Sequence, residues 1–428
     1  MKNFKFLILL LFILFFVTVV RIVSADVVVD NALNYLKSQQ DSTGRITNGF
    51  SAPSQWSAIA FAANGVDIST VKNPSISLQD FMITNVPTEP SAATDWETRI
   101  LAIVATGGDP TNYEGINYVT RLESFFENGQ IGDSCSLNDD IFGLLAEIAA
   151  GSTSSTQIKQ DVLNFLIAKQ DPVDGGFGYS APECAWYSTS SDMTGAAIQS
   201  LVAAKNNGLT NPILDDAIAR AKNYLLVNQN GDGGYGYYGS SDSDTTGWVL
   251  MAFNVLDMND STVSAQTKNW LISQQSPSDG GFLAFDYGLN MLISNSTTTA
   301  QAIISLSGKS WILKIFDPAT LTPTSTLSVT PTMTPTNTPT PTPLRQDSAG
   351  QASTPTSTPT PTSTPIPTLT PAPTDVETQN FASLPYPTPT PGQILGIKTT
   401  KTNKKFPIQT IIFFGLGLLS LIIHKGIM

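Results

Sequence analysis

The feature that most constrains this chain is a tandem repeat in residues 158–256. In both copies an aromatic-Leu pair is followed, after three residues, by Gln and then by Asp-Gly-Gly-aromatic-Gly. A Ser-Asp-x-Thr-Gly segment then opens an apolar stretch. Gln170 and Phe177 mark the first copy, and Gln229 and Tyr235 mark the second. A repeat with two helical segments cannot bury its apolar face alone, so the pattern predicts stacked helix pairs.

Similar pairs extend the pattern from Asp26 to about residue 316, and six pairs result. The second helix of each pair is almost entirely apolar or small, which predicts burial on all sides, whereas the first is amphipathic. Inner helices surrounded by outer ones fit a closed ring better than an open solenoid. The expected outer helices are 27–40, 78–84, 113–127, 158–170, 215–229 and 263–275, and the expected inner helices begin near residues 53, 95, 138, 191, 243 and 296.

The loop between the two helices has a physical rationale. Its glycines permit positive φ where an outer helix ends, and its aromatic side chain can fill the gap between neighbouring pairs. We expect the glutamines that precede the loops to hydrogen-bond the backbone groups freed at the turn. These scaffold glutamines are Gln40, Gln170, Gln229 and Gln275.

The aromatic-Leu, Gln and Gly-aromatic pattern recurs at residues 165–177, 224–235 and 270–282, with a weaker copy at 35–46. It resembles the repeat of squalene and hopene cyclases and of protein prenyltransferases. The resemblance implies an all-α (α/α)6 toroid with a central cavity in residues 26–316. It implies much less about function, because a fold of this kind hosts unrelated activities.

The amino-terminal residues 1–25 have the pattern of a signal peptide. Lys2 and Lys5 precede an apolar run over residues 6–20, and Ala25 ends a small-residue site suited to signal peptidase. We therefore expect a mature chain that starts near Asp26. Because Arg21 lies close to the cleavage site, an uncleaved anchor is the alternative.

Residues 317–405 are rich in Thr, Pro and Ser and predict a disordered, extended stalk. The apolar run 406–423 would span about 27 Å as a helix, enough for a single transmembrane anchor. A wall-sorting signal stays open as an alternative, although Leu384–Thr388 lacks the usual Thr-Gly ending. We expect an exported protein at the cell surface, held in the cytoplasmic membrane by this helix.

The formal net charge of −12 disfavours nucleic acid as a partner, since no basic surface can displace counterions from phosphates. The expected partners are the membrane and an extracellular small molecule or glycan. Cys135 and Cys184 predict one disulfide in an exported chain. The only histidine, His424, lies in the apolar tail, so a zinc site of the prenyltransferase type is not expected. We expect no metal and no cofactor.

Carboxylates gather where the expected inner helices begin, and in a ring those starts share one mouth. They are Asp95, Glu97, Asp139, Asp140, Asp192, Asp242 and Asp244. Helix capping is the plain interpretation of each. The segment 242–246 is also similar to the Asp-x-Asp-Asp-Thr motif of class II terpene cyclases. The resemblance implies that Asp244 is an acid and Asp242 its neighbour, although Thr245 stands where the family has a third Asp.

Aromatic side chains precede the fourth and fifth inner helices. Together with two of the aspartates they form the predicted ligand-binding set, because aromatic faces beside carboxylates suit a sugar or another small ligand. Packing between helix ends is the alternative interpretation. The set is Trp186, Tyr187, Tyr237, Tyr238, Asp192 and Asp244.

Three functions follow from these features. The first is a surface-displayed toroid that binds a glycan, peptide or apolar small molecule at its mouth. The second is an enzyme, either a terpene-cyclase relative or a glycan-cleaving hydrolase or lyase that uses two mouth carboxylates as acid and base. The candidate catalytic residues are Asp244, Asp242 and Asp192. The third is a structural spacer, and the sequence alone leaves open whether any catalysis occurs.

Overall fold

The structure is a computed structural model, and it describes residues 25–88, 91–185, 187–286 and 288–320. Most of the expected signal peptide, almost all of the stalk and the whole apolar run 406–423 lie outside these residues, so those expectations stay predictions. Within the described ranges, no helix is both long enough and apolar enough to cross a membrane.

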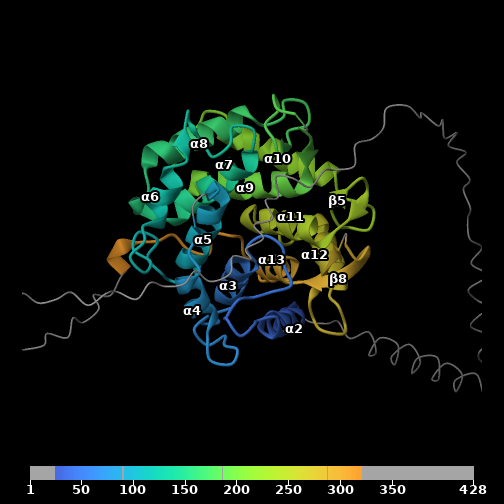
Figure 1. The fold of residues 1–428 in the computed structure, drawn as a ribbon. Helices are drawn as coiled ribbons and strands as arrows, with labels where there is room; N and C mark the ends of the chain where they lie inside the picture. Colours follow the sequence, from blue (N-terminus) through green and yellow to red (C-terminus); the bar gives the residue numbers. More distant parts are fainter. Residues whose placement is uncertain (1–24, 89–90, 186, 287, 321–428) are drawn as a thin grey trace, which may run out of the picture. The chain divides into compact units, whose positions relative to one another are not determined.

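Six helices form the inner ring of the described domain (Figure 1). Each contacts the next one in sequence, and the last, α13, also contacts the first, α3, so the ring closes. These helices are α3 (Pro53–Ala63), α5 (Ala93–Ala105), α7 (Leu137–Ala149), α9 (Ser191–Asn206), α11 (Ser243–Val255) and α13 (Ser296–Leu306).

A second set of helices packs around the ring, one against each inner helix. The set is α2 (Ala25–Ser38), α4 (Leu78–Thr84), α6 (Tyr118–Glu123), α8 (Thr156–Ala168), α10 (Leu214–Val227) and α12 (Thr262–Ser273). In Figure 1 the blue α2 and α3 lie beside α13, which joins the two ends of the domain. The predicted six helix pairs and their toroidal arrangement are thus confirmed for the described residues.

The third outer helix is shorter than expected. The sequence predicts a helix over 113–127, but α6 covers only Tyr118–Glu123. Glu114 and Gly115 both have positive φ, and Tyr113 pairs with Ile116 across that turn, so the chain cannot be helical there. The end of the expected helix is a strand instead.

Short hairpins lie between outer and inner helices, so the all-α prediction is incomplete. Four antiparallel pairs occur in the described residues, each ahead of an inner helix. They are β1 (Phe126–Glu127) with β2 (Gln130–Ile131), β3 (Phe177–Gly178) with β4 (Thr189–Ser190), β5 (Gly236–Tyr237) with β6 (Ser240–Ser241), and β7 (Phe282–Asp286) with β8 (Met291–Asn295). The last three hairpins begin at or directly after the buried aromatic residue of the glycine loop, which is Phe177, Tyr235 or Phe282. From this buried side chain the chain must return to the start of the next inner helix.

The predicted role of the glutamines is confirmed. Each side-chain Nε2 donates to a carbonyl of its own glycine loop and to a carbonyl of the next outer helix. For Gln40 the second acceptor is Val71, which precedes α4. Gln275 donates to Gly280 O at 2.9 Å and to Val28 O at 2.7 Å, so it joins the last repeat to the first. Each glutamine therefore ties two neighbouring pairs together.

A second repeated contact fixes how each inner helix is rotated. The backbone N–H of the buried loop residue donates to a side-chain oxygen near the start of the next inner helix. In three repeats the acceptor is a threonine hydroxyl: Phe177 to Thr194, Tyr235 to Thr246 and Phe282 to Thr299, at 2.8–2.9 Å. Ser54 takes this place in the first repeat and Asp140 in the third. Residues that lie the same number of positions before or after these acceptors therefore occupy equivalent places on their inner helices.

After α13 the chain crosses the carboxyl ends of the inner helices. Trp311 N donates to the Gln199 side chain, and Phe316 N donates to Ala149 O at 2.7 Å. Trp311 has no exposed surface. Residues 307–316 therefore close the ring at the carboxyl ends of the inner helices. We call the opposite end, where the inner helices begin, the mouth.

Candidate functional site

The centre of the ring is filled by aromatic rings one turn below the mouth. Trp56, Phe142 and Trp248 each lie two residues beyond the side chain that accepts the loop N–H, on alternate inner helices α3, α7 and α11. Phe142 contacts Trp56 and Trp248, with ring centroids 5.9 and 5.7 Å apart. Trp311 contacts all three from below, at 4.7–5.8 Å. We call these four residues the aromatic floor.

The floor corrects the expectation of a central cavity that the family resemblance implies. At this level the axis of the ring holds side chains, and any ligand at the mouth would rest on them. Gln301 has the equivalent place on α13, two residues beyond Thr299. The aromatic floor could not be predicted from the sequence, because its members are far apart in the chain and one of them follows the last helix.

Three aspartates meet above the floor, at the amino ends of α9 and α11. Asp192 shifts the pKa of both Asp242 and Asp244, and Asp242 shifts that of Asp244, so the three carboxyls are electrostatic neighbours. All three side chains are partly exposed. We call them the aspartate group. The structure therefore brings together the three residues that the sequence offers as catalytic candidates.

Asp242 has the capping role that the plain interpretation gives it. It is the N-cap of α11 and accepts from Thr245 N at 2.8 Å and from the Thr245 hydroxyl at 2.9 Å. Thr245, which replaces the third Asp of the cyclase motif, therefore supports the cap. Burial nevertheless raises the pKa of Asp242 to about 6.

Asp244 is different, because its carboxyl accepts no hydrogen bond from a backbone N–H of the described residues. Its Oδ1 accepts from the Thr298 hydroxyl of α13 at 2.8 Å. Burial and the neighbouring Asp242 raise the pKa of Asp244 to about 7. A carboxyl group with such a pKa is substantially protonated at neutral pH and can give up a proton.

Asp192 lies among hydrogen-bond donors. Its Oδ1 accepts from the Ser190 hydroxyl at 2.5 Å and from Met193 N at 2.8 Å. Its Oδ2 accepts from the Tyr237 hydroxyl at 2.5 Å. Both carboxylate oxygens of Asp192 are therefore fixed in position by hydrogen-bond donors. Tyr237, which is 42% exposed, extends from β5 over this group.

The other aromatic residues of the predicted ligand set do not join the aspartate group. The Tyr187 hydroxyl donates to Asp171 at 2.9 Å, in the loop that follows α8. Tyr238 is fully exposed and has positive φ at the tip of the β5–β6 hairpin. Trp186 lies outside the described residues. Of the three aromatics that the structure describes, Tyr237 alone is placed beside the aspartates.

A second set of carboxyls lies at the amino ends of α5 and α7. Glu97 has no exposed surface, and neither of its carboxyl oxygens has a hydrogen-bond partner among the described residues. Burial, then Asp139 and Asp140, raise the pKa of Glu97 well above its usual range. Burial raises the pKa of Asp140 to about 8 and also raises that of Asp139. We call Glu97, Asp139 and Asp140 the buried acidic group.

A disulfide joins Cys135 to Cys184 beside the buried acidic group. It connects the loops that lead into α7 and α9, where Ser136 pairs with Ser180 and Leu137 N donates to Tyr179 O. These loops form one continuous rim in front of Asp139.

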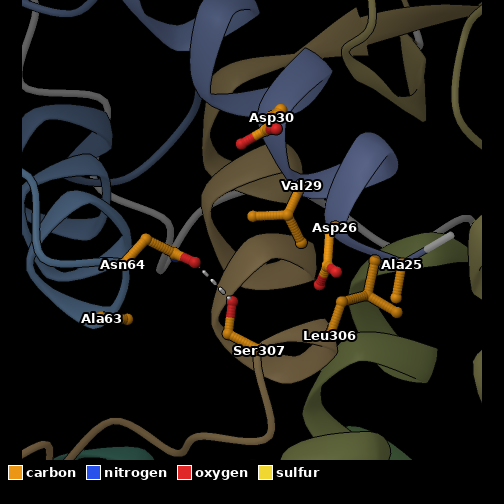
Figure 2. A pocket seen from close by; sticks show the side chains of 8 residues that line it. All are labelled: Ala25, Asp26, Val29, Asp30, Ala63, Asn64, Leu306 and Ser307. Carbon is orange, nitrogen blue, oxygen red and sulfur yellow. Dashed lines mark hydrogen bonds between the residues drawn. The ribbon is translucent and has the colours of Figure 1, made fainter.

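A shallow hollow of about 260 Å³ lies away from both acidic groups (Figure 2). Its lining comes from the start of α2 and from the carboxyl ends of α3 and α13, where the Ser307 hydroxyl donates to Asn64 at 3.0 Å. The hollow is therefore at the end of the ring opposite the mouth, and it contains none of the predicted site residues.

No family model matches the sequence, and no curated protein matches it. Solved structures resemble the arrangement of its helices. An ent-copalyl diphosphate synthase from Streptomyces platensis is 15% identical, with a TM-score of 0.44 over 60% of this chain and 50% of that one. This chain thus spans half of that protein.

Two glycan-processing proteins are also similar in structure. The unsaturated glucuronyl hydrolase of Bacillus sp. GL1 is 9% identical, with a TM-score of 0.48 over 65% of this chain and 95% of that one. A polysaccharide lyase is 10% identical, with a TM-score of 0.49 over 67% of this chain and 97% of that one. The contacts between its own helices define this chain as an α/α toroid, the fold that its repeat predicts. Its chemistry depends on its own residues.

Proposed function

We propose that the chain is an acid–base glycoside hydrolase whose site is the aspartate group, with Asp244 as general acid and Asp192 as general base. The observation that carries the proposal is the raised pKa of Asp244, about 7, in a partly exposed carboxyl that caps no helix. Acid–base catalysis needs two carboxyl groups whose surroundings favour opposite protonation states. Asp192 accepts hydrogen bonds on both of its carboxylate oxygens, which hold it in place for the role of base.

In this reaction the Asp244 carboxyl donates its proton to the glycosidic oxygen as the bond to the anomeric carbon breaks. The Asp192 carboxylate takes a proton from the water that attacks that carbon, and both groups then exchange protons with solvent. Asp192 and Asp244 hold the same place on adjacent inner helices, and packed helices lie about 8–10 Å apart. A carboxyl separation of about 6.5–9.5 Å would leave room for the water and give inversion at the anomeric carbon.

The same observations weigh against terpene cyclisation. Protonating an alkene needs a very strong acid, and the burial that raises the pKa of Asp244 makes it a weak one. Thr245 also replaces the third Asp of that motif. Binding without turnover is the second candidate function, and it is favoured by the aromatic floor and by Tyr237, which suit a sugar whether or not the bond is cleaved.

We also propose that the chain acts outside the cell, exported by residues 1–25 and held at the surface through residues 406–423. The disulfide between Cys135 and Cys184 supports this location, because such bonds persist in oxidising compartments. Labelling of intact cells with a membrane-impermeant reagent would overturn the proposal if the toroid stayed unlabelled.

The proposed activity is tested by incubating the protein with defined oligosaccharides and measuring new reducing ends. Asp244→Asn should lower kcat about 10²–10⁴-fold, the contribution of one general acid. Activity of the wild type should fall as pH rises above about 7, because Asp244 then loses its proton. Asp215→Asn is the matched control, since Asp215 is an exposed residue of α10 paired with Lys205. Oligosaccharide binding without any new reducing ends would favour the binding function instead.

A further inference from the structure

The negative charge of the aspartate group affects whether an acidic, a basic or a neutral glycan can bind at the mouth. The charged groups that shift the pKa values of Asp242 and Asp244 are other aspartates. Lys169, the cation that lowers the pKa of Asp140 in the buried acidic group, is paired with Glu183 and lies over the Phe165 ring at 5.0 Å. A substrate carboxylate placed here would meet like charges and no described cation to offset them, at a cost that partial burial increases.

A positively charged sugar meets a different obstacle. An ammonium group beside Asp244 would favour the ionised carboxylate and lower the pKa that burial raises to about 7. The acid would then have no proton to donate at neutral pH. Since the proposed function needs that proton, an amino sugar with a free amine is disfavoured at this position.

The aromatic floor offers what a neutral sugar ring needs. Trp248 follows Asp244 by one helical turn, so the two side chains project from the same face of α11. Trp248 is partly exposed, whereas Trp56 and Trp311 are buried beneath the mouth. An aromatic face packs against the apolar C–H face of a pyranose while its hydroxyl groups stay free to hydrogen-bond.

Polar atoms of the floor add a second requirement. Gln301 is only 3% exposed, and its Oε1 has no hydrogen-bond partner among the described residues. The indole nitrogens of Trp248 and Trp311 also have none. Buried polar groups are normally satisfied, so this set points to a bound group. A hydroxyl both donates to an amide oxygen and accepts from an indole, whereas a carboxylate can only accept.

We propose that the substrate of the mouth is a neutral hexose glycan, bound over Trp248, and that chains of uronic acids are excluded. This inference rests on the proposed function and deepens it by naming the substrate class.

The test offers the full-length protein oligosaccharides of gluco, manno and galacto configuration, each as hexose, hexuronate and 2-amino-2-deoxyhexose. Binding is measured by calorimetry and cleavage by new reducing ends. We expect at least one hexose series to bind at least tenfold more tightly than its hexuronate. Since salt screens charge repulsion, that ratio should shrink between about 0.02 and 0.5 M salt.

A rim variant sharpens the test without touching the aspartates. Tyr238→Lys adds a cation at a fully exposed position beside Tyr237 and should narrow the hexose-to-hexuronate ratio. Tyr238→Gln, the neutral control, should leave the ratio unchanged. Hexuronates that bind as tightly as hexoses, or no binding in any hexose series, would overturn the inference. Hexose binding without cleavage would refute the hydrolase proposal and leave the assigned ligand class standing.

Discussion

The two acidic groups at the mouth are built from the same residue types at similar positions of neighbouring inner helices, yet their surroundings differ. The aspartate group of α9 and α11 is partly exposed, and each carboxyl accepts at least one hydrogen bond. In the buried acidic group of α5 and α7, Asp139 is also partly exposed and hydrogen-bonded. Asp140 is buried, however, and Glu97 has neither exposure nor a hydrogen-bond partner among the described residues. A raised pKa therefore has two different consequences. In a partly exposed residue it leaves a proton available for transfer at neutral pH, and in a buried residue it lowers the stability of the fold as pH rises.

The largest expected effect concerns the stability of the buried acidic group. Burial raises the pKa of Asp140 to about 8 and that of Glu97 well above its usual range, so the folded state binds more protons than the unfolded state. Stability should therefore be greatest near pH 4 and be lost as pH rises towards about 8. For Asp140 a shift from 3.8 to about 8 corresponds to at most about 6 kcal/mol.

Asp140→Thr is the variant that isolates this effect. Threonine holds the equivalent place in three other repeats, so it keeps an acceptor for Ile131 N while removing the charge. Urea unfolding at pH 5 and pH 8 should show a gain of a few kcal/mol at pH 8 and little change at pH 5. Glu97→Gln should act in the same direction. If the free energy of unfolding depends on pH in both variants as it does in the wild type, burial of these carboxyls does not limit stability, and the two acidic groups do not differ in this respect.

An intermediate effect is expected from the disulfide, which braces the rim in front of the buried acidic group. Replacing Cys135 and Cys184 by serine opens a loop closed at a sequence separation of 49 residues. The expected loss is about 2–4 kcal/mol in the free energy of unfolding. Hydrogen exchange should rise in the loops that lead into α7 and α9 and stay unchanged at α11 and α13. An equal rise in hydrogen exchange at both acidic groups would contradict the prediction that the disulfide stabilises only the loops beside the buried acidic group.

The smallest effect is expected at Tyr237, whose hydroxyl donates to Asp192 Oδ2. Tyr237→Phe keeps the ring and removes one of the three hydrogen bonds that position the Asp192 carboxylate. The variant should lower kcat on the best hexose substrate about tenfold while the melting temperature stays within a degree or two. Tyr238→Phe is the control, because Tyr238 lies in the same hairpin and is fully exposed. A similar loss in both variants would mean that the hairpin as a whole matters, and not the bond to Asp192.

Much of the fold was predictable from the sequence because its contacts repeat. The glutamine and glycine-aromatic pattern occurs several times at fixed order, and each copy makes the same two hydrogen bonds. Three of the four hairpins were missed because strands of two residues leave no alternation to detect. The five-residue strand β7 was missed because its first four residues are all apolar and so do not alternate. The aromatic floor was missed because it depends on the rotation of three separate helices and on Trp311, which belongs to no repeat.

The residue types of the site could be predicted from the sequence, but the burial of these residues and the resulting pKa shifts could not. Aspartates at helix starts were expected to converge, and Asp192, Asp242 and Asp244 do. The burial of Glu97 could not be inferred, because its neighbours in sequence give no measure of how deeply α5 and α7 pack. One signal was present: Asp140 holds the position where three other repeats have threonine, and a repeat that replaces a neutral acceptor by a carboxyl marks an unusual environment.

The segment that closes the ring also determines how the mouth is presented. Residues 25 and 26 line the hollow with Leu306 and Ser307, and Phe316 meets Ala149 at the same end of the inner helices. The chain thus enters and leaves the toroid on one face, and the aspartate group opens on the other. Attachment through either end would leave the mouth pointing away from the point of tethering, so a polymer far larger than the protein could be engaged without obstruction by its own support.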